Sequence, residues 1–474
     1  MGSLPPSRRF KAASVAILGA GSSGIAAAKY LLAENAFSRI VIFEQRPTVG
    51  GLWIHSPCED ASGEITIPQT SPHAGLQKPI WADEAAENPT FISPVYDRLE
   101  TNIPRGLMAF SDQSWPEDTQ LFPKHTQVLS YLQKHSQQVQ HLIHFNTQVQ
   151  SVRQTSTGNW TVTTKRISKI SPSPPEEETF DAVVIGNGHY DVPKLPDVPG
   201  IEAFNTAFPG VITHSKFYRV PETYTGKKVI IVGNSASGID IGSQIATVCA
   251  LPLLQSQKSE SYLKVGESSP SIVEKPEIVE YILTNRSVRF ADGSIESDVD
   301  AIVYCTGYFY SFPFLDELNP PVITTGERVE NTYQHIFYRP NPSLAFLALN
   351  QKVIPFPWAE AQAAVIARVF SGRLALPDED EMKRWEDSLV AEMGTGTAFH
   401  VLKFPKDAAS INMMHDWAMS ADGEGGKAPV LWGEEQWWVR ERFPNIKKAF
   451  AELGEGRHQA RTLEDVGFKF EGRE

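Results

Sequence analysis

Two short segments of this sequence have residue types and spacing that suit the binding of a pyrophosphate. In the first, Gly19, Gly21 and Gly24 stand at G-x-G-x-x-G spacing directly after the apolar run Val15 to Leu18. The first glycine of such a turn permits a tight bend, the second lets the backbone approach a pyrophosphate, and the third lets strand and helix pack closely. "IAAAKYLLAE" follows as the expected helix, whose N-terminal amides would face the phosphates. This segment predicts a dinucleotide site.

An acidic residue at the end of the next expected strand strengthens this prediction. The segment "RIVIFE" ends at Glu44, which lies 44 − 24 = 20 positions after Gly24. At that distance a carboxylate is expected to accept hydrogen bonds from a ribose. A strand-helix turn without a ligand would explain the glycines but not Glu44. We therefore expect a dinucleotide with an unphosphorylated ribose here.

The second segment, "VIIVGNSASGID", repeats the strand, turn and helix pattern. Gly233 and Gly238 bracket Asn234, Ser235 and Ser237 in the pattern G-x-S-x-S-G. Ser235 stands where the middle glycine is usual, and its hydroxyl can itself donate to a phosphate. A hydrolase nucleophile elbow, G-x-S-x-G, is excluded because Ser237 occupies the place of its last glycine.

The two turns differ at the ribose position. Twenty positions after Gly238 the sequence has Lys258, with Ser256 two residues before it, and no acid. A cation and a hydroxyl at this place suit a 2′-phosphate, as in NADP. A solvated surface lysine is the alternative interpretation of Lys258.

A resemblance to a known family rests on residues between and beyond the two turns. "FPGVITHSKFY" places Phe208, Gly210, His214 and Tyr218 in the pattern F-x-G-x-x-x-H-x-x-x-Y. This pattern resembles the identifying motif of flavin-containing monooxygenases. Related Baeyer–Villiger enzymes usually carry Trp where this chain has Tyr218. We assign His214 a structural role.

Four further segments, within residues 14–375, are similar to segments of the same family. They are "FEQRPTVGGLW", similar to the second flavin segment, "YDRLETNIPRGLM", which places Asn102 beside the flavin, "VVIGNGHYDVPKLPDVPG", with Asn187 where Thr is usual, and "VYCTGY" with Thr306 and Gly307. The cofactor-binding residues that we assign are Gly19, Gly21, Ser22, Ser23, Gly24, Glu44, Gln45, Gly51, Leu52, Trp53, Asn102, Val149, Gly233, Asn234, Ser235, Ser237, Gly238, Ser256, Lys258, Thr306 and Gly307.

The resemblance implies the cofactors FAD and NADP and a reaction with molecular oxygen. NADPH would deliver a hydride to FAD, and reduced FAD would react with oxygen to give a C4a-hydroperoxide that bound NADP shields from water. A soft nucleophile, the nitrogen of an amine or the sulfur of a sulfide, would then take up the oxygen atom. Asn102 is the candidate catalytic residue, as a hydrogen-bonding group near the adduct. A Baeyer–Villiger enzyme acting on a ketone and a non-catalytic, redox-sensing flavoprotein remain alternatives.

The elements that must position these residues form an α/β fold with two Rossmann-like dinucleotide-binding domains. The order of the motifs predicts that the NADP domain, residues 206–300, is inserted into an FAD domain made of residues 1–205 and 301–474. We expect a hairpin loop at Ile167 to Glu178 and a Trp-rich helical extension after about residue 376, wrapped on the FAD domain.

Composition narrows the function classes. The net charge of −13 argues against a nucleic-acid partner. Cys58, Cys249 and Cys305 are isolated, which disfavours a disulfide framework, favours the cytoplasm and excludes a disulfide reductase with a cysteine pair. No His/Cys cluster has metal spacing, and no apolar run is long enough for a membrane span. Arg8 and Arg9 could belong to a twin-arginine signal, but the apolar run after them is needed as a strand. The oligomeric state stays open, with a homodimer as one candidate.

Overall fold

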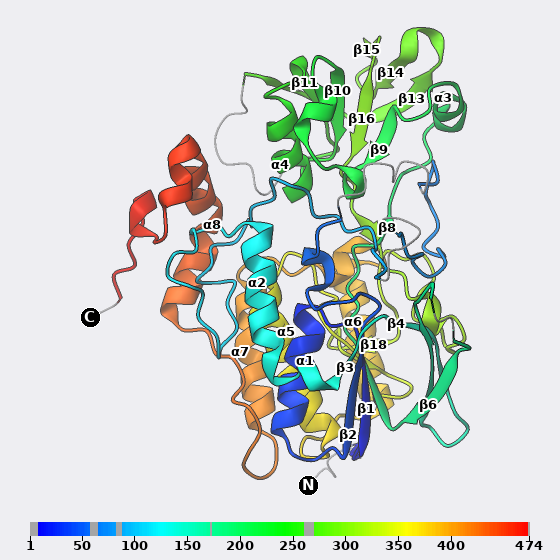
Figure 1. Cartoon of the computed structure of the whole chain (residues 1–474), viewed down its shortest axis with the longest axis vertical. Helices are drawn as coiled ribbons and strands as arrows, with labels where there is room; N and C mark the ends of the chain where they lie inside the picture. The colour runs from blue at the N-terminus through cyan, green and yellow to red at the C-terminus, as the bar shows by residue number, and fades with distance from the viewer. Residues whose placement is uncertain (1–7, 57–64, 82–87, 171–172, 260–269, 473–474) are drawn as a thin grey trace.

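The chain folds into two α/β units joined by crossing segments (Figure 1). The structure, a computed structural model, describes residues 8–56, 65–81, 88–170, 173–259 and 270–472. The predicted fold class, two Rossmann-like units with one inserted into the other, is confirmed. The segment with Cys58 lies outside the described residues.

The first unit is built on a seven-stranded sheet. Its order is β18 (Thr332–Tyr333), β19 (Phe337–Tyr338), β20 (Leu344–Phe346), β7 (Ala182–Ile185), β1 (Ser14–Leu18), β2 (Arg39–Phe43) and β3 (Ile143–His144). The strands from β20 to β3 are parallel. Their carboxyl ends therefore meet at one edge, where open α/β sheets bind their ligands.

Two helices pack together against this sheet because their side chains are small. Helix α1 (Ser22–Ala33) carries the run Ala26–Ala28, and α5 (Pro355–Phe370) carries five alanines between 359 and 367. Both helices are almost wholly buried, and alanine lets their backbones approach closely while favouring the helix. Helix α2 (His125–His135) packs beside them (Figure 1).

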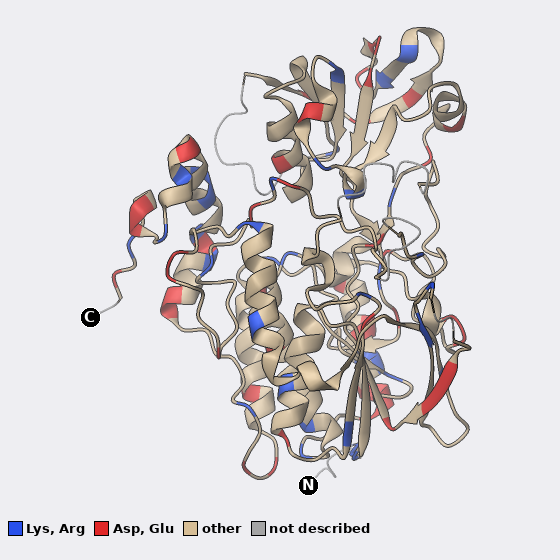
Figure 2. Ribbon diagram, in the orientation of Figure 1, with Lys and Arg blue, Asp and Glu red and all other residues tan. Residues whose placement is uncertain are grey.

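A three-stranded antiparallel sheet covers part of the first unit. It consists of β4 (Thr147–Gln154), β5 (Trp160–Arg166) and β6 (Glu176–Phe180). β5 pairs with β6 on either side of the predicted hairpin loop at residues 167–178, whose last three residues begin β6 and of which residues 171–172 lie outside the described residues. The acidic start of β6 stands out in Figure 2. Glu177 pairs with Arg153 at 2.6 Å, and Glu178 pairs with Arg39.

The second unit is built on a five-stranded parallel sheet. Its order is β12 (Ile272–Lys275), β11 (Ala250–Ser256), β10 (Lys228–Val232), β16 (Ala301–Tyr304) and β9 (Ile212–His214), with α4 (Ala236–Ile245) after β10. A small antiparallel sheet of β13 (Ile278–Ile282), β14 (Ser287–Phe290) and β15 (Ile295–Glu296) and the helix α3 (Ile201–Ala207) complete it.

The second unit extends beyond both of its predicted boundaries, residues 206 and 300. On the C-terminal side, strand β16 lies between β10 and β9 in the sheet of the second unit, and its four residues are buried. On the N-terminal side, Leu195, Val198, Ile201 and Phe204 belong to the apolar core of the second unit. The two crossings between the units pair with each other, β8 (Val192–Pro193) with β17 (Tyr308–Phe309).

The C-terminal region is helical, as predicted. Its helices are α6 (Glu379–Met393), which lies near β18, and α7 (Lys406–Met419) and α8 (Glu434–Glu452), which lie along one side of the first unit (Figure 1). Trp417, Trp432, Trp437 and Trp438 contribute to the core that also contains α1 and α5. None of the helices in the described residues is long and apolar enough to span a bilayer.

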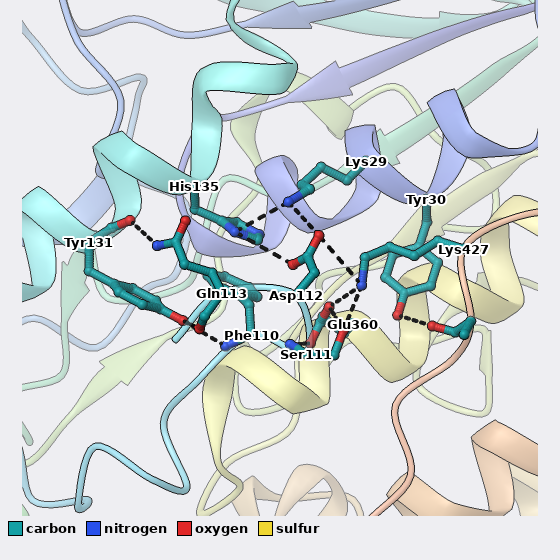
Figure 3. Close-up of polar contacts among 11 residues, drawn as sticks. Lys29, Tyr30, Phe110, Ser111, Asp112, Gln113, Tyr131, His135, Glu360 and Lys427 are labelled. Atoms are coloured by element: carbon teal, nitrogen blue, oxygen red, sulfur yellow. Dashed lines mark hydrogen bonds and ion pairs between the residues drawn. The ribbon is translucent and has the colours of Figure 1, made fainter. Parts of the chain in front are cut away.

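A buried polar cluster fastens the segment before α8 to α1 and α5 (Figure 3). The Lys29 ammonium lies 2.6 Å from the Asp112 carboxylate, and the Lys427 ammonium lies 2.9 Å from that of Glu360. Burial, together with the nearby Lys29 ammonium, lowers the pKa of His135 to about 3. This imidazole is therefore neutral and can accept a hydrogen bond from Lys29 at 3.4 Å.

Candidate functional site

The first glycine turn lies at the carboxyl edge of the seven-stranded sheet and has no room for side chains at two of its glycines. Gly19 has φ +97°, and a Cβ there would lie 2.8 Å from the Gly186 carbonyl oxygen. A Cβ at Gly24 would lie 1.9 Å from the Gly19 carbonyl oxygen. Close packing of β1, α1 and β7 therefore requires glycine at both positions.

The remaining glycine of this turn faces a glycine of the next motif. A Cβ on Gly51 would lie 3.0 Å from Cα of Gly21, so two bare backbones meet over the start of α1. Gly21 is the N-cap of α1 and supplies no side-chain cap, while Ser22 and Ser23 form the first turn. The first amides of a helix lack carbonyl partners within it. The cradle thus fits a pyrophosphate.

Glu44 stands at the end of β2, beside this turn. Its buried carboxylate accepts a hydrogen bond from the Ala20 amide at 2.7 Å and another from the Arg46 amide at 2.8 Å. Each carboxylate oxygen has a second lone pair, which leaves capacity for ribose hydroxyls. Gln45 accepts a hydrogen bond from Gln148 at 3.0 Å.

The other residues assigned to the flavin side lie around this edge. Leu52 and Trp53 belong to the short helix η1 (Gly51–Trp53), and the Leu52 carbonyl accepts a hydrogen bond from Ser93. Val149 lies in β4, next to an irregularity in the pairing of β4 with β5. Their contact with a cofactor stays a prediction.

Three polar side chains that the sequence analysis missed are available to a ligand in the segment and helix after β20. Asn350 Oδ1, Trp358 Nε1 and Gln362 Nε2 are buried without a hydrogen-bond partner among the described residues. They follow β20, whose end is fixed by the Leu347 amide donating to the Ile185 carbonyl. Buried polar groups without partners are rare and call for one. The polar Gln362 within the apolar run of α5 was the available sequence signal.

Asn102 lies in a loop that other residues hold in place. Thr101 donates its hydroxyl to the Ile103 carbonyl at 2.8 Å, and its amide donates to the Pro123 carbonyl at 2.9 Å. Within the part of the chain that the structure describes, the half-buried Asn102 amide makes no hydrogen bond. The turn is therefore stabilised by Thr101, and the Asn102 side chain is available to a ligand.

The second glycine turn has the same construction as the first. A Cβ on Gly233 would lie 2.7 Å from the Cys305 carbonyl oxygen, and one on Gly238 would lie 2.1 Å from the Gly233 carbonyl oxygen. Ser235 is the N-cap of α4 and makes no side-chain cap bond, and Ser235 and Ser237 are exposed. This open helix start fits a second pyrophosphate.

At the ribose position of this turn, the two assigned side chains differ in exposure. Ser256 is buried and donates its hydroxyl to the Pro276 carbonyl at 3.0 Å, and its contact with a cofactor stays a prediction. Lys258 is 79% exposed and lies 3.0 Å from the Glu277 carboxylate. Asn234 donates to Gln257 Oε1 at 2.6 Å. Recognition of a 2′-phosphate would therefore rest on Lys258, in competition with Glu277.

Thr306 and Gly307 stabilise the crossing between the units. The Thr306 hydroxyl donates to the Lys194 carbonyl, and the Gly307 carbonyl accepts from the Lys194 amide at 3.0 Å. His214 Nδ1 accepts from the Lys216 amide, so its proton is on Nε2, which donates to the Gly307 carbonyl at 3.1 Å. Burial lowers the pKa of His214 to about 3. The structural role predicted for His214 is confirmed, whereas cofactor contacts of Thr306 and Gly307 stay a prediction.

A cavity of about 760 Å³ is separate from both turns. It is lined by Lys29, Leu32, Asp112, Lys427 and Trp432 among others. Leu32 is ten residues, or about 15 Å of helix, beyond the start of α1 that faces the first turn.

Two pyrophosphate cradles, each at the carboxyl ends of parallel strands, fit a protein that binds two dinucleotides. Comparison with known proteins makes the class specific. A family model described as flavin-binding monooxygenase-like matches residues 80–267 and 269–394, and one for an NAD(P)-binding Rossmann-like domain matches residues 17–60.

Individual relatives agree. The chain is 33% identical over 392 residues to flavin-containing monooxygenase FMO GS-OX3 of Arabidopsis thaliana, covering 80% of this chain and 78% of that protein. It is 34% identical over 463 residues to FMO GS-OX-like 6 of the same plant, covering 91% of each. The structure of S-allyl-L-cysteine S-oxygenase from Allium sativum has a TM-score of 0.75 and 28% identity, covering 97% of both chains. The chain belongs to the flavin-containing monooxygenase family, with FAD and NADP as cofactors.

Proposed function

We propose that this protein is an NADPH- and oxygen-dependent monooxygenase that transfers one oxygen atom to the nitrogen or sulfur of a small soft nucleophile, with a thioether sulfur as the stronger candidate. The observation that carries the preference for sulfur is the end-to-end likeness to the S-allyl-L-cysteine S-oxygenase. FAD supplies the oxygen chemistry when it is bound and reduced by NADPH.

The residues of the chain bind and orient the two cofactors and exclude water from the site. The Gly21 and Gly51 cradle holds the FAD pyrophosphate, and Glu44 accepts from its ribose. The turn from Gly233 to Gly238 holds the pyrophosphate of NADP, and Lys258 binds its 2′-phosphate. The Asn102 amide donates and accepts hydrogen bonds beside the flavin ring. A protein nucleophile is not required, because oxygen transfer to a soft nucleophile needs no covalent enzyme–substrate bond.

A substrate screen tests the proposal. Purified protein with FAD and NADPH is supplied in parallel with S-allyl-cysteine, a tertiary amine and a cyclic ketone, and products are followed by mass spectrometry. We expect the thioether to gain one oxygen atom at the expense of one NADPH. Oxygenation of the amine alone would move the proposal to nitrogen, and a lactone from the ketone would identify a Baeyer–Villiger enzyme. NADPH oxidation without oxygen uptake in any arm would contradict a monooxygenase.

A further inference from the structure

Lys447, on the C-terminal helix α8, contacts the loop that carries Asn102. Its ammonium donates to the Thr101 carbonyl at 2.8 Å, across 346 positions of sequence. The same ammonium lies 4.6 Å from the centroid of the Phe122 ring and 5.4 Å from that of Phe450. The side chain therefore crosses an aromatic layer to reach one backbone carbonyl.

The charges around Lys447 come from three parts of the chain. Glu100, beside the Asn102 loop, and Asp240, on α4 of the second unit, both attract the ammonium, while Arg457 repels it. Glu100 is itself held by Arg457 at 3.2 Å and by His458 at 3.4 Å. Burial lowers the pKa of Lys447, against the attraction of the two carboxylates. A buried cation of this kind needs its partners in place.

Asp240, on α4, is hydrogen-bonded to Tyr96, which precedes the Asn102 loop in the chain. It accepts hydrogen bonds from Tyr96 and, at 3.0 Å, from Gln244. Gln244 accepts in turn from Tyr218, the last residue of the family motif, at 3.0 Å. Asp240 lies on the helix whose first turn faces the second pyrophosphate cradle.

We propose that Lys447 is a positioning residue, which fixes the peptide plane between Thr101 and Asn102 and thereby the direction of the Asn102 side chain. The proposal rests on the proposed function. The Asn102 amide makes no hydrogen bond to the described residues, so its direction depends on the backbone that carries it. A misplacement of about 1 Å in an active site can lower a rate by about 100-fold. Helix α8 thereby contributes to the site without touching a cofactor.

The competing explanation is that Lys447 only stabilises the fold. The same helix packs into the core through Val439, Ile446 and Phe450. A matched control separates the two explanations. Lys448 is the next residue on α8, and its exposed ammonium lies 3.8 Å from Glu452. Lys447→Met keeps an unbranched apolar side chain on the Phe122 ring but removes the donor, and Lys447→Arg restores a donor and a positive charge.

The experiment compares K447M, K447R and K448M with the unchanged full-length protein loaded with FAD. The readouts are the dissociation constant of NADP+ by calorimetry, the rate of hydrogen peroxide release from NADPH and oxygen without substrate, and the melting temperature. We expect K447M to weaken NADP+ binding and to speed peroxide release, each roughly threefold to tenfold. K448M should match the unchanged protein, and K447R should recover most of the loss.

Two results would overturn the inference: K447M with unchanged NADP+ affinity and peroxide release, whatever its melting temperature, or the same changes in K448M. If K447M does not fold, Lys447→Leu, which also removes the donor to the Thr101 carbonyl, is measured in its place, and unchanged values for both readouts would overturn the inference equally. Neither readout needs a substrate. A screen that finds no oxygenated product would therefore contradict the proposed function while leaving the role of Lys447 measurable.

Discussion

The preference for NADPH can be tested through the pair of Lys258 and Glu277. Lys258→Ala should weaken the use of NADPH while leaving NADH unchanged, because only NADPH carries the 2′-phosphate. Lys258 is 79% exposed, and contacts of exposed charges contribute at most about 1 kcal/mol. We therefore expect a loss of roughly fivefold in kcat/KM for NADPH.

The neighbouring Glu277 carboxylate provides a second test of the phosphate assignment, in which the use of NADPH should improve. Glu277 lies 3.0 Å from Lys258, so it competes for the cation and repels a bound phosphate. At about 6 Å in water, a carboxylate repels a dianion by roughly 1 kcal/mol. Glu277→Gln should therefore improve the use of NADPH by roughly twofold to fivefold, and the gain should shrink as salt screens it.

The assay is kcat/KM for NADPH and for NADH, measured at low and high salt for K258A, E277Q and the double variant. Equal effects of K258A on both cofactors would refute the phosphate assignment. An E277Q protein that uses NADPH less well than the unchanged protein would also refute this assignment, because removal of a competing charge should improve the use of NADPH.

Three further predictions concern the remaining site residues. Asn102→Ala should shift NADPH oxidation from product to hydrogen peroxide with little change in melting temperature, because Thr101 stabilises the turn. A lowered melting temperature with an unchanged product-to-peroxide ratio would instead indicate a structural role for Asn102. Glu44→Gln keeps an acceptor for the Ala20 amide but removes the negative charge. The amount of FAD released on dilution should therefore rise by roughly tenfold, which corresponds to about 1.4 kcal/mol for a charged hydrogen bond. Equal FAD retention in the variant and the unchanged protein would contradict the ribose contact. Burial lowers the pKa of His214 to about 3, so the folded protein binds fewer protons than the unfolded chain below pH 6.5 and its stability falls with acidification. His214→Gln should make the fall in melting temperature between pH 6.5 and 4 shallower, and an unchanged slope would disagree with a neutral His214.

Local spacing determined much of this protein. Each glycine turn follows a short apolar strand and precedes a helix, and the steric limits at Gly19, Gly24, Gly233 and Gly238 are set by neighbours that such a unit always brings together. The acid at Glu44 sits at the end of β2 for the same reason. The two-unit fold followed from finding this pattern twice.

Tertiary structure alone decided where the remaining residues act. From the sequence alone, the buried strand β16 could belong to either sheet, because a short apolar run does not reveal its neighbours. Only the tertiary structure shows that it lies between β10 and β9. Ser256 and Lys258 are two residues apart on the chain, yet one faces the interior and the other the solvent, beside Glu277. The contact of Lys447 with Thr101 crosses 346 positions and carries no local pattern, since long-range contacts depend on how whole helices pack and not on the spacing of neighbouring residues.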